Sequence, residues 1–349
     1  MTFTQNDVID VLKGILYFPK GDNIVNLNMV EDIRLGENKI SFVLVFEKLE
    51  GPAVQIVQEQ SEKALKERFG NQMQIEMQAI SEKERGRGPL GKVKHVIAVA
   101  SGKGGVGKST VAANLAVALA RKGLKVGMID ADIYGPSIPT MFGLEGQRPA
   151  STEVDGKPKI VPLLAHGVQL VSIGFFVEPD QPLIWRGPMA SSTLNQLFND
   201  TYWEELDVAV IDLPPGTGDI QLTMATSISV DGAVMVSTPQ KVAVSDVRKA
   251  VSMFRQDKIT VPILGIVENM AYFTPKELPD NKYYIFGKDA CRNYAKETGL
   301  DILGQIPLVQ SIAESGDSGN PIVLEDNDSV AKAFNDLADN VLAKLEIKS

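Results

Sequence analysis

The most constraining feature of this chain is the glycine-rich segment SGKGGVGKST at residues 101–110. It follows an apolar run at residues 95–100 and precedes an alanine- and leucine-rich run at residues 111–120, so it joins a predicted strand to a predicted helix. In this context the pattern G-x-x-x-x-G-K-[ST] is typical of a loop that binds phosphate groups. Glycines let successive backbone N–H groups point at phosphate oxygens, and the helix N-terminus adds partial positive charge. The segment therefore predicts a nucleotide-binding site.

The side chains of this loop have separate expected roles. We expect Lys108 to contact the β- and γ-phosphates and the Ser109 hydroxyl to bind Mg²⁺. Two alternatives remain: a turn used only for packing, and a dinucleotide loop built on three of the glycines. The adjacent lysine and serine favour a mononucleotide triphosphate instead. The predicted nucleotide-binding residues of the loop are Gly102, Lys103, Gly104, Gly105, Val106, Gly107, Lys108, Ser109 and Thr110.

Two further apolar segments are each predicted to be strands that end in carboxylates. One ends at Asp212 and is followed by a loop with two glycines, and the other ends at Asp130 and Asp132. Ligands of parallel sheets bind at the carboxyl ends of the strands. We expect Asp212 and Asp130 to support Mg²⁺ and Asp132 to orient the water that attacks ATP. The alternative is that these residues only cap turns.

The composition limits the classes of partner. The 349 residues carry a net charge of −9, which disfavours a broad surface for nucleic acid or anionic membranes. No apolar stretch approaches the roughly 18 residues that a membrane-spanning helix needs, and no secretory signal is visible at the N-terminus. We therefore expect a cytoplasmic protein. The single cysteine, Cys291, excludes an intrachain disulfide.

The chain is predicted to contain two α/β domains. Residues 1–81 have the order helix 7–16, strands 25–35 and 39–46, helix 52–69 and strand 72–80, and residues 82–92 have the composition of a linker. Residues 93–349 alternate short apolar strands with helices, which predicts a mostly parallel sheet covered on both faces. The expected strands are 94–100, 126–129, 168–173, 208–212, 233–237, 263–267 and 302–306, and the expected helices are 108–122, 189–199, 220–227, 242–256, 288–298 and 329–345.

The second lysine of the loop, Lys103, resembles the deviant Walker A motif of the ParA/MinD/NifH class of P-loop ATPases. The segments DADIYGPS, DLPPGTGD, ENM and GQIPL resemble the Mrp (ApbC) branch of that class, and residues 1–81 are similar to a MIP-type domain. The resemblance implies an ATP- and Mg²⁺-dependent ATPase that forms a homodimer, with Lys103 reaching the phosphates of the partner. It also implies that Asn269 and Pro307 contact adenine.

The resemblance further implies a role in binding iron–sulfur clusters and transferring them to apoproteins, or in working with assembly factors. The family uses a Cys-x-x-Cys pair just after the Asn-Met segment, but residues 271–287 of this chain contain no cysteine. A cluster held by four cysteines needs four thiolates, and a dimer of this chain supplies two. We expect Cys291 to be a buried packing residue, with a ligand to a dimer-bridging cluster as the alternative. The segment 271–287 is expected to form a packed loop or an adaptor-binding surface.

Three functional hypotheses follow. The first is an ATPase that carries clusters or acts as an ATP-driven scaffold for them. The second is a positioning ATPase of the ParA/MinD kind on DNA or membrane, and the third is a nucleotide-dependent adaptor without a cluster. The predicted helix 329–345 has a polar face of mixed charge and lacks the basic excess of a membrane-surface helix. We therefore expect no nucleic-acid or membrane partner.

Overall fold

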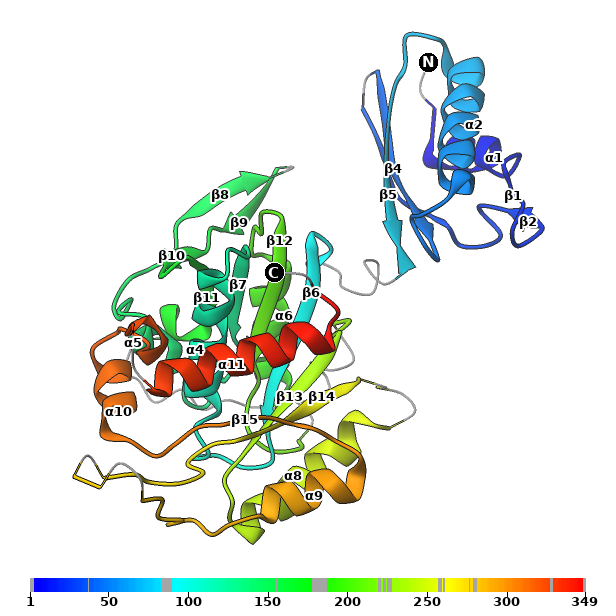
Figure 1. Ribbon diagram of the computed structural model, residues 1–349. Coiled ribbons are helices and arrows are strands. Elements are labelled where there is room, and N and C mark those ends of the chain that lie inside the picture. Colours follow the sequence, from blue (N-terminus) through cyan, green and yellow to red (C-terminus); the bar gives the residue numbers. More distant parts are fainter. Residues whose placement is uncertain are drawn as a thin grey trace. The chain divides into compact units, whose positions relative to one another are not determined.

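The computed structural model describes residues 3–347 except 37, 83–89, 155, 178–186, 219–220, 222–223, 225–227, 257–258, 260, 276, 279–280 and 327–328. The chain divides into two compact units, Met1–Gly91 and Lys92–Ser349 (Figure 1). Most of the linker predicted for residues 82–92, and most of the helix predicted for residues 220–227, lie outside the described residues. In the described part of the chain no helix is long and apolar enough to cross a bilayer.

The first unit is a small sheet backed by two helices. The sheet order is β3-β4-β5, with β3 and β4 antiparallel and β4 and β5 parallel. Alternate side chains of β4 point into the core, which is why Ile40, Phe42 and Leu44 are buried. The elements are α1 (Gln5–Leu12), β1 (Leu16–Tyr17), β2 (Asp22–Asn23), β3 (Val30–Leu35), β4 (Lys39–Phe46), α2 (Pro52–Phe69) and β5 (Gln74–Ser81).

Two predictions in this unit were wrong in their bounds. The helix expected over residues 7–16 ends at Leu12, because Gly14 follows and the next residues pair in the short β1–β2 hairpin. The strand expected over residues 25–35 begins only at Val30. The side-chain oxygen of Asn23 accepts hydrogen bonds from the backbone N–H groups of Val25 and Asn26, which stabilises a turn there instead.

The second unit contains an eight-stranded sheet of order β10-β11-β7-β12-β6-β13-β14-β15. Every neighbouring pair is parallel except β10 and β11. The seven strands predicted for this unit are confirmed. The strands are β6 (Val93–Ser101), β7 (Val126–Asp130), β10 (Leu163–Ala165), β11 (Val168–Ser172), β12 (Leu206–Asp212), β13 (Gly232–Ser237), β14 (Ile263–Glu268) and β15 (Ile302–Gln305).

Helices cover both faces of this sheet. Helix α4, which follows β6, packs against α11, and both contribute to the main hydrophobic core (Figure 1). Helices α8 and α9 pack on each other and on β13, β6, β14 and β15. The connections through α8 and α9 run toward the β15 edge of the sheet, whereas the connection through α4 runs toward the β10 edge. Because such connections are right-handed, α8 and α9 lie on the face opposite α4. The helices are α4 (Lys108–Arg121), α5 (Ile138–Met141), α6 (Gly187–Asn199), α8 (Lys241–Phe254), α9 (Ala290–Thr298), α10 (Gln310–Asp317) and α11 (Ser329–Lys344).

The strand order brings the predicted acidic residues together. Strand β12 lies between β6 and β7, so Asp212 stands beside Asp130 in the register. Both residues are at the carboxyl edge of the sheet, where β6 runs into the glycine-rich loop. The sequence does not predict the β8–β9 hairpin (Ser151–Val154 and Lys157–Ile160), β10 or α10.

Candidate functional site

The glycine-rich loop joins β6 to α4 and takes backbone conformations that favour glycine. Gly105 has φ 78° and Gly107, the N-cap of α4, has φ 79°, in the left-handed region that other residues rarely adopt. No side chain caps the N-terminus of α4, and its first turn holds no acidic residue. The unsatisfied N–H groups of this turn are therefore available to an anion.

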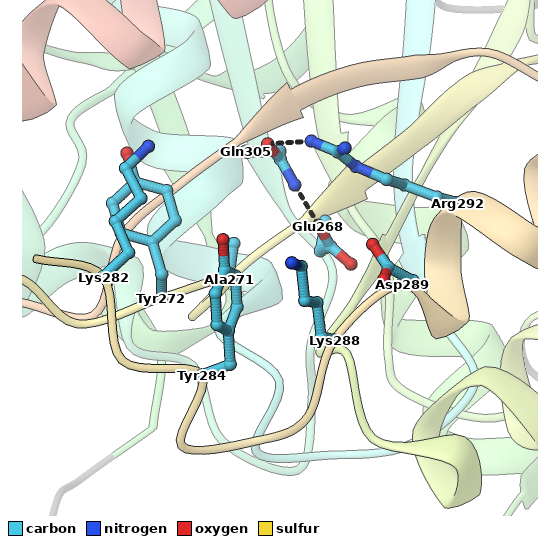
Figure 2. Close-up of a pocket in the computed structure, with 9 residues that line it drawn as sticks. All are labelled: Glu268, Ala271, Tyr272, Lys282, Tyr284, Lys288, Asp289, Arg292 and Gln305. Atoms are coloured by element: carbon cyan, nitrogen blue, oxygen red, sulfur yellow. Dashed lines mark hydrogen bonds between the residues drawn. The ribbon is translucent and has the colours of Figure 1, made fainter.

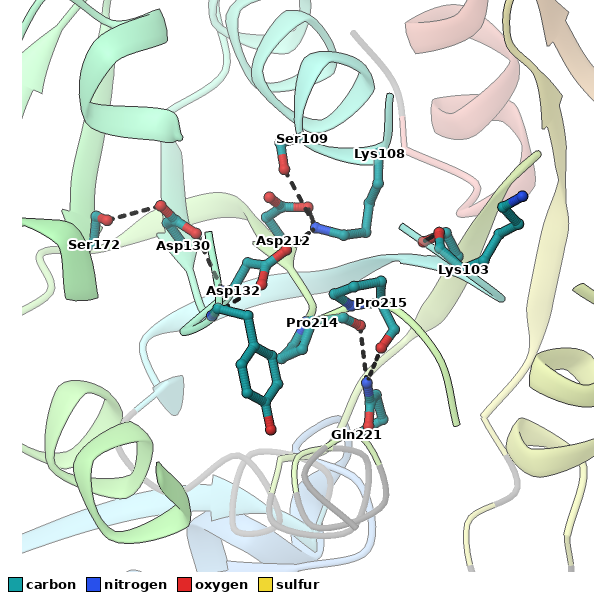
Figure 3. Close-up of polar contacts among 12 residues, drawn as sticks. Lys103, Lys108, Ser109, Asp130, Asp132, Ser172, Asp212, Pro214, Pro215 and Gln221 are labelled. Carbon is teal, nitrogen blue, oxygen red and sulfur yellow. Dashed lines mark hydrogen bonds and ion pairs between the residues drawn. The ribbon is translucent and has the colours of Figure 1, made fainter. Parts of the chain in front are cut away.

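The Lys108 side chain folds back onto two carboxylates. Its Nζ lies 2.6 Å from Oδ1 of Asp212 and 3.2 Å from Oδ2 of Asp132, and it is only 6% exposed (Figure 3). Its Nζ also lies 3.3 Å from the Oγ of Ser109. The loop lysine, the loop serine and the acids of two strands thus form one cluster, as the sequence predicts. Behind it, Asp130 accepts a hydrogen bond of 2.7 Å from Oγ of Ser172.

The charges of this cluster are unbalanced, since one ammonium faces three carboxyl groups. Burial, followed by the nearby charge of Asp212, raises the pKa of Asp130 to about 8. Burial also raises the pKa of Asp212, although Lys108 opposes that shift. For Lys108 burial lowers the pKa, but Asp212 and Asp132 outweigh it, so the net pKa is raised and the lysine stays charged. The cluster therefore holds a proton on a carboxyl group near neutral pH.

The residues present fit a bound Mg²⁺ ion. Oδ2 of Asp212 is buried and accepts no hydrogen bond of good geometry from the residues that the structure describes, and an orphaned buried oxygen of this kind is suited to a further ligand. Within the described ranges no three His, Cys, Asp or Glu side chains are grouped to hold a metal. A P-loop magnesium ion does not need such a group, because phosphates, water, one hydroxyl and one or two carboxylates suffice. Ser109 and Asp212 are the residues that would hold it. The expected support from Asp130 stays a prediction, since that carboxyl group is bonded to Ser172 behind the cluster.

A mainly apolar pocket of about 410 Å³ opens beside the end of the loop. Gly107, Thr110, Asn269 and Pro307 line it, together with side chains of α5 and α10. Its size and position suit the base and sugar of a nucleotide whose phosphates lie on the loop. The predicted base-contacting residues Asn269 and Pro307 are thus next to the phosphate loop, although they follow its last residue, Thr110, by 159 and 197 positions in the chain.

Asn269 also has a structural role that the sequence does not reveal. Its Nδ2 donates a hydrogen bond of 2.8 Å to the carbonyl oxygen of Val106, and the side chain is buried. A Cβ on Gly107 would lie 2.2 Å from that nitrogen, so only glycine leaves room for the contact. Asn269 therefore fixes the last turn of the loop.

Lys103 lies apart from the cluster. Its side chain points away from Lys108 and the carboxylates (Figure 3), while its carbonyl oxygen accepts a hydrogen bond from Oγ of Ser101. The neighbouring Gly102 packs so closely on α8 that a Cβ would lie 2.2 Å from the backbone of Asp246. The loop is thus held from one side by helix α8.

Ser172 is a site residue that the sequence analysis missed. It ends strand β11 at the same edge as Asp130, and it is fully buried with its hydroxyl directed at that carboxyl group. The available signal was a serine at the end of an apolar strand, next to strands that end in acids. That signal becomes useful only once the strand order is known.

Cys291 is buried at the start of α9. Its Sγ lies 3.4 Å from the carbonyl oxygen of Thr238, and burial, followed by the charge of Glu268, raises its pKa to about 12. Thiolates are the form that ligates iron, and this thiol stays protonated at neutral pH. The geometry agrees with the expected packing role.

Comparisons with known proteins agree with this geometry. A family model described as "ParA: NUBPL iron-transfer P-loop NTPase" matches residues 92–342. An "Iron-sulfur cluster carrier protein" of Synechocystis is 41% identical over 99% of this chain and 98% of its own length. A protein of the same description from Escherichia coli K12 is 50% identical over 72% of this chain and 67% of its own length.

Solved structures are also similar. A nucleotide-binding protein of Archaeoglobus fulgidus in complex with ADP is 38% identical, with a TM-score of 0.59, over 70% of this chain and 94% of its own. The cell division ATPase MinD of Pyrococcus furiosus is 21% identical, with a TM-score of 0.50, over 72% of this chain and 99% of its own. The second likeness shows a shared fold alone.

Proposed function

Because this chain belongs to the ParA family of NUBPL-type iron-transfer P-loop NTPases, we propose that it binds and hydrolyses ATP to support the transfer of iron–sulfur clusters to apoproteins. The observation that carries the proposal is the assembly of one site from distant segments. The phosphate loop, the carboxylates of β7 and β12, and the pocket beside Asn269 meet at one edge of the sheet. The MinD-like fold by itself gives no support to a positioning function on DNA or membrane.

The first step is an exchange of partners by Lys108. With ATP present, its ammonium leaves Asp212 and Asp132 for the β- and γ-phosphates, which carry more charge. The amides of the loop and of the first turn of α4 bind the same phosphates. Ser109 and Asp212 would hold a bound Mg²⁺ ion, which would supply positive charge for the triphosphate.

The second step is attack by water on the γ-phosphate. Release of Lys108 frees Oδ2 of Asp132, which at 8% is the most exposed of the three carboxyl groups. Asp132 then orients the water in line with the bond that breaks. Lys103, which points away from its own cluster, is proposed to reach the phosphates of a second copy and to stabilise the charge that develops there.

In this proposal the iron–sulfur cluster is cargo, and the single thiol of this chain is not suited to hold it. The chain has one cysteine, and that cysteine is buried with a raised pKa. We propose that the thiolates come from donor and acceptor proteins, and that the ATPase acts on the complex between them. Residues 1–81, as a MIP-type domain, are proposed to take part in this contact.

The test measures Mg-ATP binding by calorimetry and phosphate release by the wild type, by Lys108→Ala and by Lys122→Ala. Lys122 is the matched control, because it follows the other end of α4 and pairs with Asp339 at the surface. We expect Lys108→Ala to lose turnover and the control to keep it. Turnover per subunit should also fall on dilution and fall in Lys103→Ala. Equal turnover in Lys108→Ala would overturn the assignment.

A second assay separates transfer from hydrolysis. A cluster-loaded donor protein and an apo acceptor are mixed with and without this protein and ATP, and acceptor activity is followed under anaerobic conditions. We expect ATP-dependent acceleration that Cys291→Ala retains. Reconstitution of the isolated chain with iron and sulfide should give no visible absorption that depends on Cys291. Acceleration without ATP, or its loss in Cys291→Ala, would refute the proposed mode of transfer.

A further inference from the structure

A second pocket, separate from the nucleotide site, lies at the carboxyl edge of β14 and β15. It encloses about 70 Å³ and is lined mainly by charged and polar groups. Figure 2 shows them converging from three elements: Glu268 from β14, Gln305 from β15, and Lys288, Asp289 and Arg292 at the start of α9. The function proposed above uses none of these side chains.

The floor of the pocket is a buried carboxylate with an unused oxygen. Glu268 is 2% exposed, and its Oε2 accepts a hydrogen bond from the side-chain amide of Gln305. The amide oxygen of Gln305 accepts in turn from Arg292, at 2.6 Å. Oε1 of Glu268 is buried and has no hydrogen-bond partner of good geometry among the described residues, although the thiol of Cys291 lies near this carboxylate. Leaving a buried carboxyl oxygen in that state is costly, so a hydrogen-bond donor from a ligand would stabilise the pocket.

The walls of the pocket carry mostly the opposite charge. The ammonium of Lys282 lies 4.0 Å from the ring centre of Tyr272, and that of Lys288 lies 4.8 Å from the ring centre of Tyr284. These rings hold the two lysines at the pocket without neutralising them. Helix α9 begins here, and its N-cap residue, Asp289, makes no capping hydrogen bond with its side chain. The walls therefore offer hydrogen-bond donors to an anionic group.

A ligand with a single charge does not suit a pocket that combines carboxylates with lysine and arginine side chains. A simple anion would be repelled by Glu268 and by Asp289, which also lines the pocket. A simple cation would be repelled by the two lysines and by Arg292. A ligand that carries an ammonium and a carboxylate a few ångströms apart satisfies both sets at once.

We propose that this pocket binds a free α-amino acid, with its ammonium on Glu268 and its carboxylate on Lys288 and the N-terminal turn of α9. The volume admits this ligand, since a single water molecule needs only about 10–15 Å³ of such space and the pocket offers about 70 Å³. That space holds the ammonium, the α-carbon and the carboxylate. The side chain of the amino acid then extends out of the pocket.

The pocket is chemically independent of the nucleotide site. Glu268 is the last residue of β14, and Asn269 is the first residue of the turn that follows it. Glu268 lines the amino-acid pocket, whereas Asn269 holds the phosphate loop and lines the nucleotide pocket. Binding at one pocket can therefore be lost while binding at the other persists.

The test is a calorimetric screen of the full chain against the common L-amino acids, with acetate and methylammonium as probes that carry one charge each. We expect at least one amino acid to bind at millimolar concentration or below, and neither single-charge probe to bind at the same concentration. Lys288→Gln and Glu268→Gln are each expected to weaken binding at least tenfold. Lys332→Gln, on the exposed face of α11, is the matched control and should bind normally.

The variants are checked by Mg-ATP calorimetry in the same samples. Lys288→Gln should retain nucleotide binding, which shows that the protein is folded and separates a failure of this proposal from a failure of the proposed ATPase. If Glu268→Gln does not fold, Lys288→Gln decides alone. The proposal is overturned if no amino acid binds the wild type, if acetate or methylammonium binds equally well, or if Lys288→Gln leaves the affinity unchanged.

Discussion

Replacing Asp130 by asparagine should stabilise the second unit of this protein at neutral pH. Asp130 is fully buried, and its pKa is raised to about 8. In the unfolded chain an aspartate has a pKa of about 3.9, so at pH 7 only the folded state binds a proton there. At 1.36 kcal/mol per unit, this linkage costs the folded state up to about 4 kcal/mol at pH 7. Asparagine has nearly the same shape and removes this cost. Its single oxygen can still accept from Ser172, but its amide nitrogen then faces the backbone N–H of Asp132, so the net gain is smaller than about 4 kcal/mol.

The sign of the pH dependence is a sharper test than the magnitude at one pH. Because the folded state binds more protons than the unfolded state, the free energy of unfolding falls as the pH rises from about 4 to about 8. The Asp130→Asn variant loses most of that slope, and its advantage over the wild type vanishes near pH 4. Asp212, whose pKa is also raised, leaves a residual slope.

The assay is urea unfolding at pH 5, 6, 7 and 8 without nucleotide or Mg²⁺, followed by tryptophan fluorescence. No tryptophan occurs in residues 1–91, and Trp203 is buried in the second unit, so the signal reports that unit. Asp207→Asn, at the other end of β12, is the control, because it should change the free energy of unfolding at pH 7 in the opposite direction. Its hydrogen bond with Lys94 lowers the pKa of Asp207, so asparagine should destabilise at pH 7 and not in acid. Equal slopes in Asp130→Asn and the wild type would refute the reasoning.

Three further predictions concern the loop and the thiol. Asn269→Ala leaves the carbonyl of Val106 without its donor and should weaken Mg-ATP binding about tenfold, which calorimetry checks; unchanged affinity would contradict the role of this hydrogen bond. Gly102→Ala should destabilise the second unit by about 1–3 kcal/mol in urea, because its Cβ would lie 2.2 Å from the backbone of α8. Gly104→Ala, with 3.9 Å to its nearest neighbour, is the matched variant and should not. Cys291, with a pKa of about 12, should react with a thiol reagent at pH 8 only after denaturant is added, and rapid labelling of the folded protein would disprove its burial.

The sequence predicts the second sheet well because its strands are nearly continuous apolar runs separated by helical patterns. Such runs are buried on both faces in a parallel sheet, and little else accommodates them. The β8–β9 hairpin was missed because its strands are short and mix lysine, glutamate and proline with few apolar residues. The helix over residues 7–16 was extended too far, because its apolar spacing continues into residues that pair as a strand.

The phosphate loop and its acids could be predicted because each follows from a local pattern. Strands that end in aspartate, combined with the edge rule for parallel sheets, are enough to place Asp130 and Asp212 near the loop. The role of Ser172 and the hydrogen bond from Asn269 to Val106 could not be predicted in this way. They join segments 42 and 163 positions apart, and only the strand order shows that they meet. The expected contact of Asn269 with adenine stays a prediction.

The close contact between Gly102 and helix α8 links loop and helix mechanically. The glycine touches the helix backbone, with no flexible side chain between them to absorb a displacement. Any shift of the loop toward α8 therefore pushes the helix axis itself. Val242, at the start of that helix, is 67% exposed. A partner protein bound to this exposed turn of α8 would therefore be displaced when the phosphate loop moves.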